Sequence, residues 1–177
     1  MHGDQYEHDY FTDVLRRKAL DWLEDYSNLK NQYDDRMLNP FLMVIAPTAP
    51  RGAQGGPIGT RGTIPAPQYE NQFSGKTAPR TPSFNFVNNG NRNKHWLMRY
   101  NSDPLDDDLI ELIDDEFRKR WRTLLSVDDM IDRVMKKLED IGELNNTFVL
   151  FSSDHGYHLG TFGMVWGKRL NYEYGKR

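Results

Sequence analysis

The sequence contains no cysteine, and this absence excludes several kinds of structure and chemistry at once. The chain of 177 residues cannot form disulfides, cannot bind a metal through thiolates and cannot use a cysteine as its nucleophile. Long hydrophobic runs are also missing, since the longest apolar stretch, Phe41–Pro50, is far too short to span a bilayer. The formal net charge of −3 predicts no broad electrostatic attraction to nucleic acid or to anionic membranes.

Two segments have the spacing of amphipathic helices. In Asp9–Asn28 and in Leu105–Leu144, apolar side chains recur every three or four residues and so share one face. The acidic run Asp106–Asp108 complements the helix dipole at the start of the second segment. We expect this second helix to break near Ser126, because Ser126–Asp129 resembles a new helix N-terminus.

Two continuous apolar runs, Phe41–Ala46 and Thr147–Ser152, predict strands that are buried on both faces of a parallel sheet. Residues 47–90 lack any periodicity and predict a long loop, in which residues 51–64 form a loop or insertion rich in glycine and arginine. Helices alternating with strands indicate an α/β domain with a mostly parallel sheet flanked by helices.

Side chains that could bind a metal follow the second predicted strand. Asp154 and His155 stand at its carboxyl end, which is where ligands bind in open α/β sheets. The carboxylate and the imidazole could bind a metal ion that stabilises negative charge on an ester oxygen, and the ammonium of Lys168 could stabilise the same charge directly. The residues alone leave other interpretations open: Asp-His-Gly after a strand is more often a turn, His158 is more often structural, and Lys168 is more often a solvated surface residue.

The order of several motifs resembles the sulfatase family, within the alkaline-phosphatase-like superfamily. The segments that carry the resemblance are Trp121–Asp129, Gly142–Thr147 and Ser153–Gly160, in this order. Further segments look like the N-acetylglucosamine-6-sulfatase branch, namely Asp9–Leu15, Ala66–Tyr69 and Asn93–Leu97. The pattern of His155–His158, Phe162–Gly163 and Gly167–Lys168 is also similar to extracellular endosulfatases that act on heparan sulfate.

The resemblance implies a sulfuric ester hydrolase that acts on 6-O-sulfated glucosamine in glycosaminoglycans such as heparan or keratan sulfate. It implies that residues 1–177 are part of an α/β catalytic domain and that a calcium ion is the cofactor. By the same similarity, Asp154 and His155 would be metal ligands and Lys168 would contact the sulfate. The intact protein would be lysosomal or secreted, although Met1–Asp4 opens a polar stretch without the apolar segment of a signal peptide.

Three departures from the family pattern concern the chemistry. The cysteine of a Cys-x-Pro-x-Arg motif, which is oxidised to the formylglycine nucleophile, is absent, as is the Asp-Asp pair that supplies further metal ligands. The Pro-His-x-Pro that normally follows the first predicted strand is replaced by Pro50–Ala53, and the chain ends where the family continues. We therefore expect a fragment that is inactive by itself. A catalytically dead, glycan-binding paralogue and a metal phosphoesterase of the same superfold remain alternatives.

Asn145 opens an Asn-Asn-Thr sequon and is a candidate for glycosylation if the protein enters the secretory pathway. A polar turn before a strand is the simpler interpretation of the same residues. The sequence makes no prediction about the oligomeric state.

Overall fold

The computed structural model describes residues 9–32, 40–51, 63–87, 103–168 and 175, and the chain divides into two compact units. Unit 1 contains residues 1–72 and 119–149, and unit 2 contains residues 73–118 and 150–177. Within these described ranges, no helix is both long enough and apolar enough to cross a bilayer. Helix α3 contributes residues to both units.

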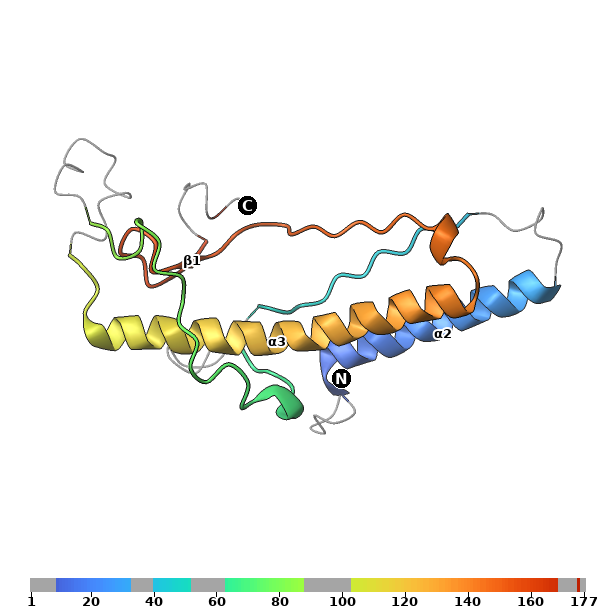
Figure 1. Ribbon diagram of the computed structural model, residues 1–177, viewed down its shortest axis with the longest axis horizontal. Helices are drawn as coiled ribbons and strands as arrows, with labels where there is room; N and C mark the ends of the chain where they lie inside the picture. Colours follow the sequence, from blue (N-terminus) through green and yellow to red (C-terminus); the bar gives the residue numbers. More distant parts are fainter. Residues whose placement is uncertain (1–8, 33–39, 52–62, 88–102, 169–174, 176–177) are drawn as a thin grey trace. The chain divides into compact units, whose positions relative to one another are not determined.

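Unit 1 is built on two parallel helices, α2 (Phe11–Gln32) and the C-terminal part of α3 (Asp107–Asp140), which lie side by side in Figure 1. Lys137 pairs with Glu24, and Lys30 Nζ lies 2.5 Å from Glu143 Oε1. The first pair joins α2 to α3, and the second joins α2 to the turn that follows α3. The predicted apolar stripes face the core only in part, because Trp22, Trp121 and Ile131 are exposed. The buried apolar residues of the two helices in this unit are Val14, Ala19, Leu23, Val127, Met130 and Leu138.

The predicted break of the second helix near Ser126 is wrong, because α3 runs without interruption from Asp107 to Asp140. Thr123, Ser126 and Val127 are all buried, so packing continues across the expected break and overrides the capping preference of the serine. Asp129 does not cap a helix but accepts a hydrogen bond from the hydroxyl of Tyr69, in the short 3₁₀ helix η2 (Pro67–Tyr69). Burial and the hydrogen bond to Asp129 raise the pKa of Tyr69 to about 12.

The two predicted strands, Phe41–Ala46 and Thr147–Ser152, are not paired with other strands. Figure 1 shows both as extended stretches, the second beginning after the 3₁₀ helix η5 (Leu144–Asn146). The only sheet in the described part of the chain is the antiparallel pair β1 (His158–Leu159) and β2 (Trp166–Gly167). The predicted parallel sheet is therefore not confirmed.

The prediction that these apolar runs are buried on both faces is also wrong for this chain. Leu42 is 88% exposed, Phe148 99% and Leu150 94%. The ring of Phe41 is covered instead by an edge-on contact with Trp22 and Tyr26 of α2, at centroid distances of 5.2 and 4.9 Å. A strand of a parallel sheet is buried only when neighbouring strands and helices cover it, and the described residues provide no such cover.

The exposed apolar side chains predict self-association of the isolated chain, because extended backbone with uncovered apolar residues can pair with another copy. We expect sedimentation velocity to show a concentration-dependent rise in mass, and we expect Phe148→Lys to reduce it. Lys136→Ala, an exposed change on α3, is the control and should leave the association unchanged. A monodisperse monomer with a sharp, reversible melting transition would contradict this prediction.

Glu143 gives unit 1 a pH-dependent contact. Its side chain is 8% exposed, and the Lys30 ammonium beside it holds the pKa of the carboxyl below its usual range. A lowered pKa in the folded state means that the contact stabilises the fold above the unfolded pKa and that this stability is lost as the pH falls through the folded pKa.

We expect Glu143→Gln to lower the free energy of unfolding by about 1–2 kcal/mol at pH 7, because it leaves the partly buried Lys30 without its charged partner. The difference from the wild type should shrink as the pH falls below that window, as measured by urea denaturation across pH. Asp132→Asn, which breaks an exposed pair with Lys136, should show neither effect. Equal stability of wild type and Glu143→Gln at pH 7 would exclude a role for this pair.

Candidate functional site

The predicted site residues lie at the two ends of a hairpin in unit 2. Strands β1 and β2 pair in the register that places His158 opposite Gly167 and Leu159 opposite Trp166. Gly160 and Gly163 have φ values of 81° and 71°, which side chains adopt only with strain, and they let the chain reverse between the strands. The reversal returns residues after β2 to the neighbourhood of residues before β1.

This reversal brings Asp154, His155 and Lys168 together. Lys168 Nζ contacts His155 Nε2, and Asp154 Oδ2 lies 3.4 Å from the same nitrogen. An ammonium group can only donate hydrogen bonds, so Nε2 accepts, and His155 Nδ1 carries the proton and donates it to the Gly156 carbonyl at 2.8 Å. The contact assigns one tautomer to His155 and leaves its Nε2 lone pair facing the carboxylate and the ammonium.

Two of these side chains fit part of a metal shell. A carboxylate oxygen and an imidazole nitrogen 3.4 Å apart can bind one cation together. Calcium takes six to eight ligands, mostly oxygens. In the described part of the chain, no group of three or more histidine and carboxylate side chains converges. Asp154 and His155 therefore fit a share of a calcium site and do not form a complete one.

His158 is set apart from these residues by its burial. Its side chain is 1% exposed, and burial lowers the pKa of the imidazole. Asp154 and Lys168, by contrast, are exposed. The position of His158 in β1 supports the structural interpretation rather than a ligand role.

A segment that sequence reasoning treated only as loop holds the hairpin in place. Residues 76–85, which we call the strap, make an isolated bridge between Phe84 and Thr161. The Asn85 amide donates to the Gly160 carbonyl and the Phe162 amide donates to the Ser83 carbonyl, each at 2.7 Å. The Phe84 ring lies against Gly160 so closely that a β-carbon there would overlap it. No periodic pattern marks such a segment, so its role could not be predicted from the residues alone.

Two other predicted features are placed only in part. Asn145 is exposed in η5, and the hydroxyl of Thr147, the third sequon residue, donates to the Glu143 carbonyl at 2.8 Å. The glycosylation hypothesis stays a prediction. Residues 52–62 of the expected insertion and Asn93–Leu97, used for the branch resemblance, lie outside the described residues.

Comparisons with known proteins identify the family to which this chain belongs. The family profile of sulfatases matches residues 2–177, so the chain belongs to the sulfatase family, as its motifs predicted. The alkaline-phosphatase-like α/β fold follows from this membership, although the parallel sheet itself is not seen in the described residues. No solved structure shows significant similarity to the chain.

Individual members of the sulfatase family show which sulfatases the chain is similar to. The chain is 42% identical over 173 residues to the N-acetylglucosamine-6-sulfatase of Homo sapiens. The aligned region covers 98% of this chain and 28% of that protein. It is 35% identical over 172 residues to a putative extracellular sulfatase Sulf-1 homolog of Caenorhabditis elegans, covering 97% of this chain and 22% of that protein. The chain thus spans about a quarter of the length of the curated relatives that it matches.

The close approach of Phe84 and Gly160 predicts a specific pattern of mutational costs. Gly160→Ala adds both strain at φ 81° and overlap with the ring, so we expect it to destabilise the chain by about 2–4 kcal/mol. In a Phe84→Ala background the overlap is gone, and the same change should cost only about 1 kcal/mol.

Gly142→Ala is the matched control, because Gly142 has a φ of 74° with nothing within 4 Å of the added carbon. Urea denaturation of the single and double variants measures the coupling. If Gly160→Ala costs no more than Gly142→Ala, the ring does not lie against this glycine.

Proposed function

We propose that this chain is part of the catalytic domain of a sulfatase that hydrolyses 6-O-sulfate esters of glucosamine units in glycosaminoglycans such as heparan or keratan sulfate. The observation that carries the proposal is the meeting of Asp154, His155 and Lys168 at the two ends of one hairpin, in a chain of the sulfatase family. The relatives of the chain support this choice of sugar, because they include N-acetylglucosamine-6-sulfatases.

The chemistry of sulfate ester hydrolysis fits these side chains. Negative charge on the sulfuryl and leaving oxygens must be stabilised, and the exposed ammonium of Lys168 can approach such an anion from solvent. Asp154 and His155 would hold the calcium ion, which when bound supplies Lewis-acid stabilisation of the same charge. In this proposal His155 Nε2 binds the calcium ion in place of the Lys168 ammonium, which frees Lys168 for the sulfate, since the Nδ1 proton of His155 is engaged by the Gly156 carbonyl.

The attacking group does not come from these 177 residues. A formylglycine forms from cysteine, and the chain has none. The contribution of the chain is therefore binding and positioning of the sulfate, and the nucleophile and further metal ligands would belong to other parts of a complete enzyme. We place that enzyme in the lysosome or outside the cell.

A second candidate is a glycan-binding, catalytically dead paralogue, and a fragment of an extracellular heparan sulfate 6-O-endosulfatase is a further alternative. The observation that favours the dead paralogue is an exposed lysine beside His155 in a chain that has no cysteine to form the nucleophile. The similarity to the putative extracellular sulfatase Sulf-1 homolog of Caenorhabditis elegans is compatible with the endosulfatase alternative. Both candidates bind a sulfated sugar at Lys168, and they differ only in whether the whole protein turns it over.

We expect the isolated chain to bind glucosamine 6-sulfate in the presence of calcium and to show no release of sulfate. Lys168→Ala should weaken binding roughly tenfold, the loss expected for one hydrogen bond to a charged group, as measured by isothermal titration calorimetry. Lys136→Ala should bind like the wild type. Measurable turnover by the wild-type chain would overturn the account of the nucleophile, and unchanged binding by Lys168→Ala would overturn the site.

A further inference from the structure

We propose that Arg80 is a positioning residue for the candidate sulfate site: held between Asp114 and the ring of Phe84, it fixes the strap, and through the strap the hairpin that brings Lys168 to His155. The inference rests on the proposed function for its meaning, although the contacts that carry it stand by themselves. All of these residues belong to unit 2.

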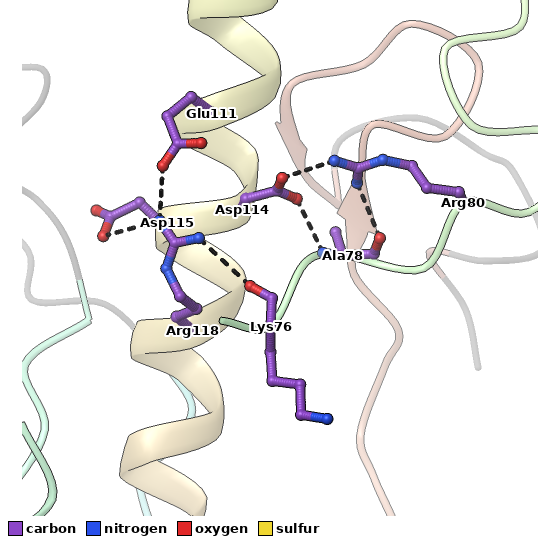
Figure 2. A network of polar contacts seen from close by, with 7 residues as sticks. All are labelled: Lys76, Ala78, Arg80, Glu111, Asp114, Asp115 and Arg118. Carbon is purple, nitrogen blue, oxygen red and sulfur yellow. Dashed lines mark hydrogen bonds and ion pairs between the residues drawn. The ribbon is translucent and has the colours of Figure 1, made fainter. Parts of the chain in front are cut away.

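The first link is a carboxylate on α3 with both oxygens occupied. Asp114 is 5% exposed, and its Oδ1 accepts the Ala78 amide at 2.9 Å while its Oδ2 accepts Arg80 Nη2 at 2.6 Å (Figure 2). A buried carboxylate is stable only when such partners compensate its lost hydration. Asp114 therefore fixes the backbone at Ala78 and the direction of the Arg80 side chain together.

The second link is the guanidinium group itself. Its other terminal nitrogen, Nη1, donates to the Ala78 carbonyl at 2.8 Å, so the planar group is held at two points. The central carbon of the guanidinium, Arg80 Cζ, lies over the Phe84 ring, 4.1 Å from its centroid. This geometry uses a planar group with several donors, which lysine cannot provide.

The third link joins the ring to the hairpin. The Phe84 ring lies against the backbone of Gly160, and the neighbouring amide of Asn85 donates to the Gly160 carbonyl at 2.7 Å. Asn85 is itself fixed, because its side chain exchanges two hydrogen bonds with the backbone of Leu105, at 2.7 and 3.1 Å. Gly160 directly follows β1, so a ring fixed by Arg80 sets the position of the hairpin whose ends carry His155 and Lys168.

A second arginine offers a matched comparison within the same network. Arg118 donates to the Lys76 carbonyl at 3.3 Å and pairs with Glu111 and Asp115 (Figure 2). It holds the beginning of the strap to α3, whereas Arg80 is the arginine that lies over the ring of Phe84. If attachment of the strap were all that mattered, the two arginines would have similar effects on the site.

The test measures the contact between Lys168 and His155 in solution. In the full 177-residue chain with labelled histidine, Lys168→Ala should shift the ring resonances of His155, because it removes the cation at Nε2. We expect this shift in the wild type and in Arg118→Gln. We expect it to be lost in Arg80→Gln and also in Arg80→Lys, since a lysine keeps the charge without the planar fork.

Each outcome of this experiment either supports or overturns the positioning role of Arg80. A shift that persists in both Arg80 variants, or that is equally lost in Arg118→Gln, overturns the positioning role of Arg80. Should circular dichroism show that Arg80→Gln is unfolded, Arg80→Lys and Asp114→Asn, which keeps an acceptor of the same size, decide by the same shift. Titration with glucosamine 6-sulfate separates the two proposals. If the His155 shift depends on Arg80 but the sugar does not bind, the proposed function is refuted and the positioning role stands. If the sugar binds but the His155 shift does not depend on Arg80, the positioning role is refuted and the proposed function stands.

Discussion

The compensation of one buried charge organises the functional part of this chain. Asp114 is buried on α3 and is bonded to the backbone of Ala78, a member of the apolar cluster with Ile113 and Phe117, and an unpaired carboxylate would be costly there. Its partners are the backbone at Ala78 and the guanidinium of Arg80, so satisfying the charge also fixes an otherwise irregular segment. The strap has no helix or strand of its own to define it, and this polar anchor takes their place.

The hairpin shows how a weak local element can bring polar side chains together. Two strands of two residues each contribute little stability by themselves. They are held by the bridge between Phe84 and Thr161 and by the packing of a ring on Gly160, a position that tolerates no side chain. Residues at the base of such a hairpin can present charged groups to solvent, as Asp154 and Lys168 do, while His158 remains buried in the unit.

Sulfatase chemistry requires groups from several places in a fold, and in our proposal this chain would supply a subset of them. Lysine and a pair of metal-ligand candidates meet, whereas no described carboxylate or imidazole completes the shell. The exposed apolar residues at Leu42 and Phe148 point to the same incompleteness at the level of packing, because such runs are stable when covered on both faces. A chain that matches about a quarter of its relatives' length is consistent with both observations.

Sequence patterns predicted the parts of this protein that depend on local periodicity and on short motifs. The apolar spacing located α2 and α3 to within a few residues, and the motifs around Asp154 and Lys168 indicated the sulfatase family and the candidate site. Three features depended on contacts between distant residues and were not predictable in this way. Continuity of α3 through Ser126 follows from burial on its packed face, and the unpaired state of Phe41–Ala46 follows from the absence of neighbours among the described residues. The role of Arg80 follows from a carboxylate 34 residues away. Helix spacing is recorded in the sequence because each turn repeats the same geometry, whereas the partner of a buried charge is decided only when tertiary folding brings the two groups together.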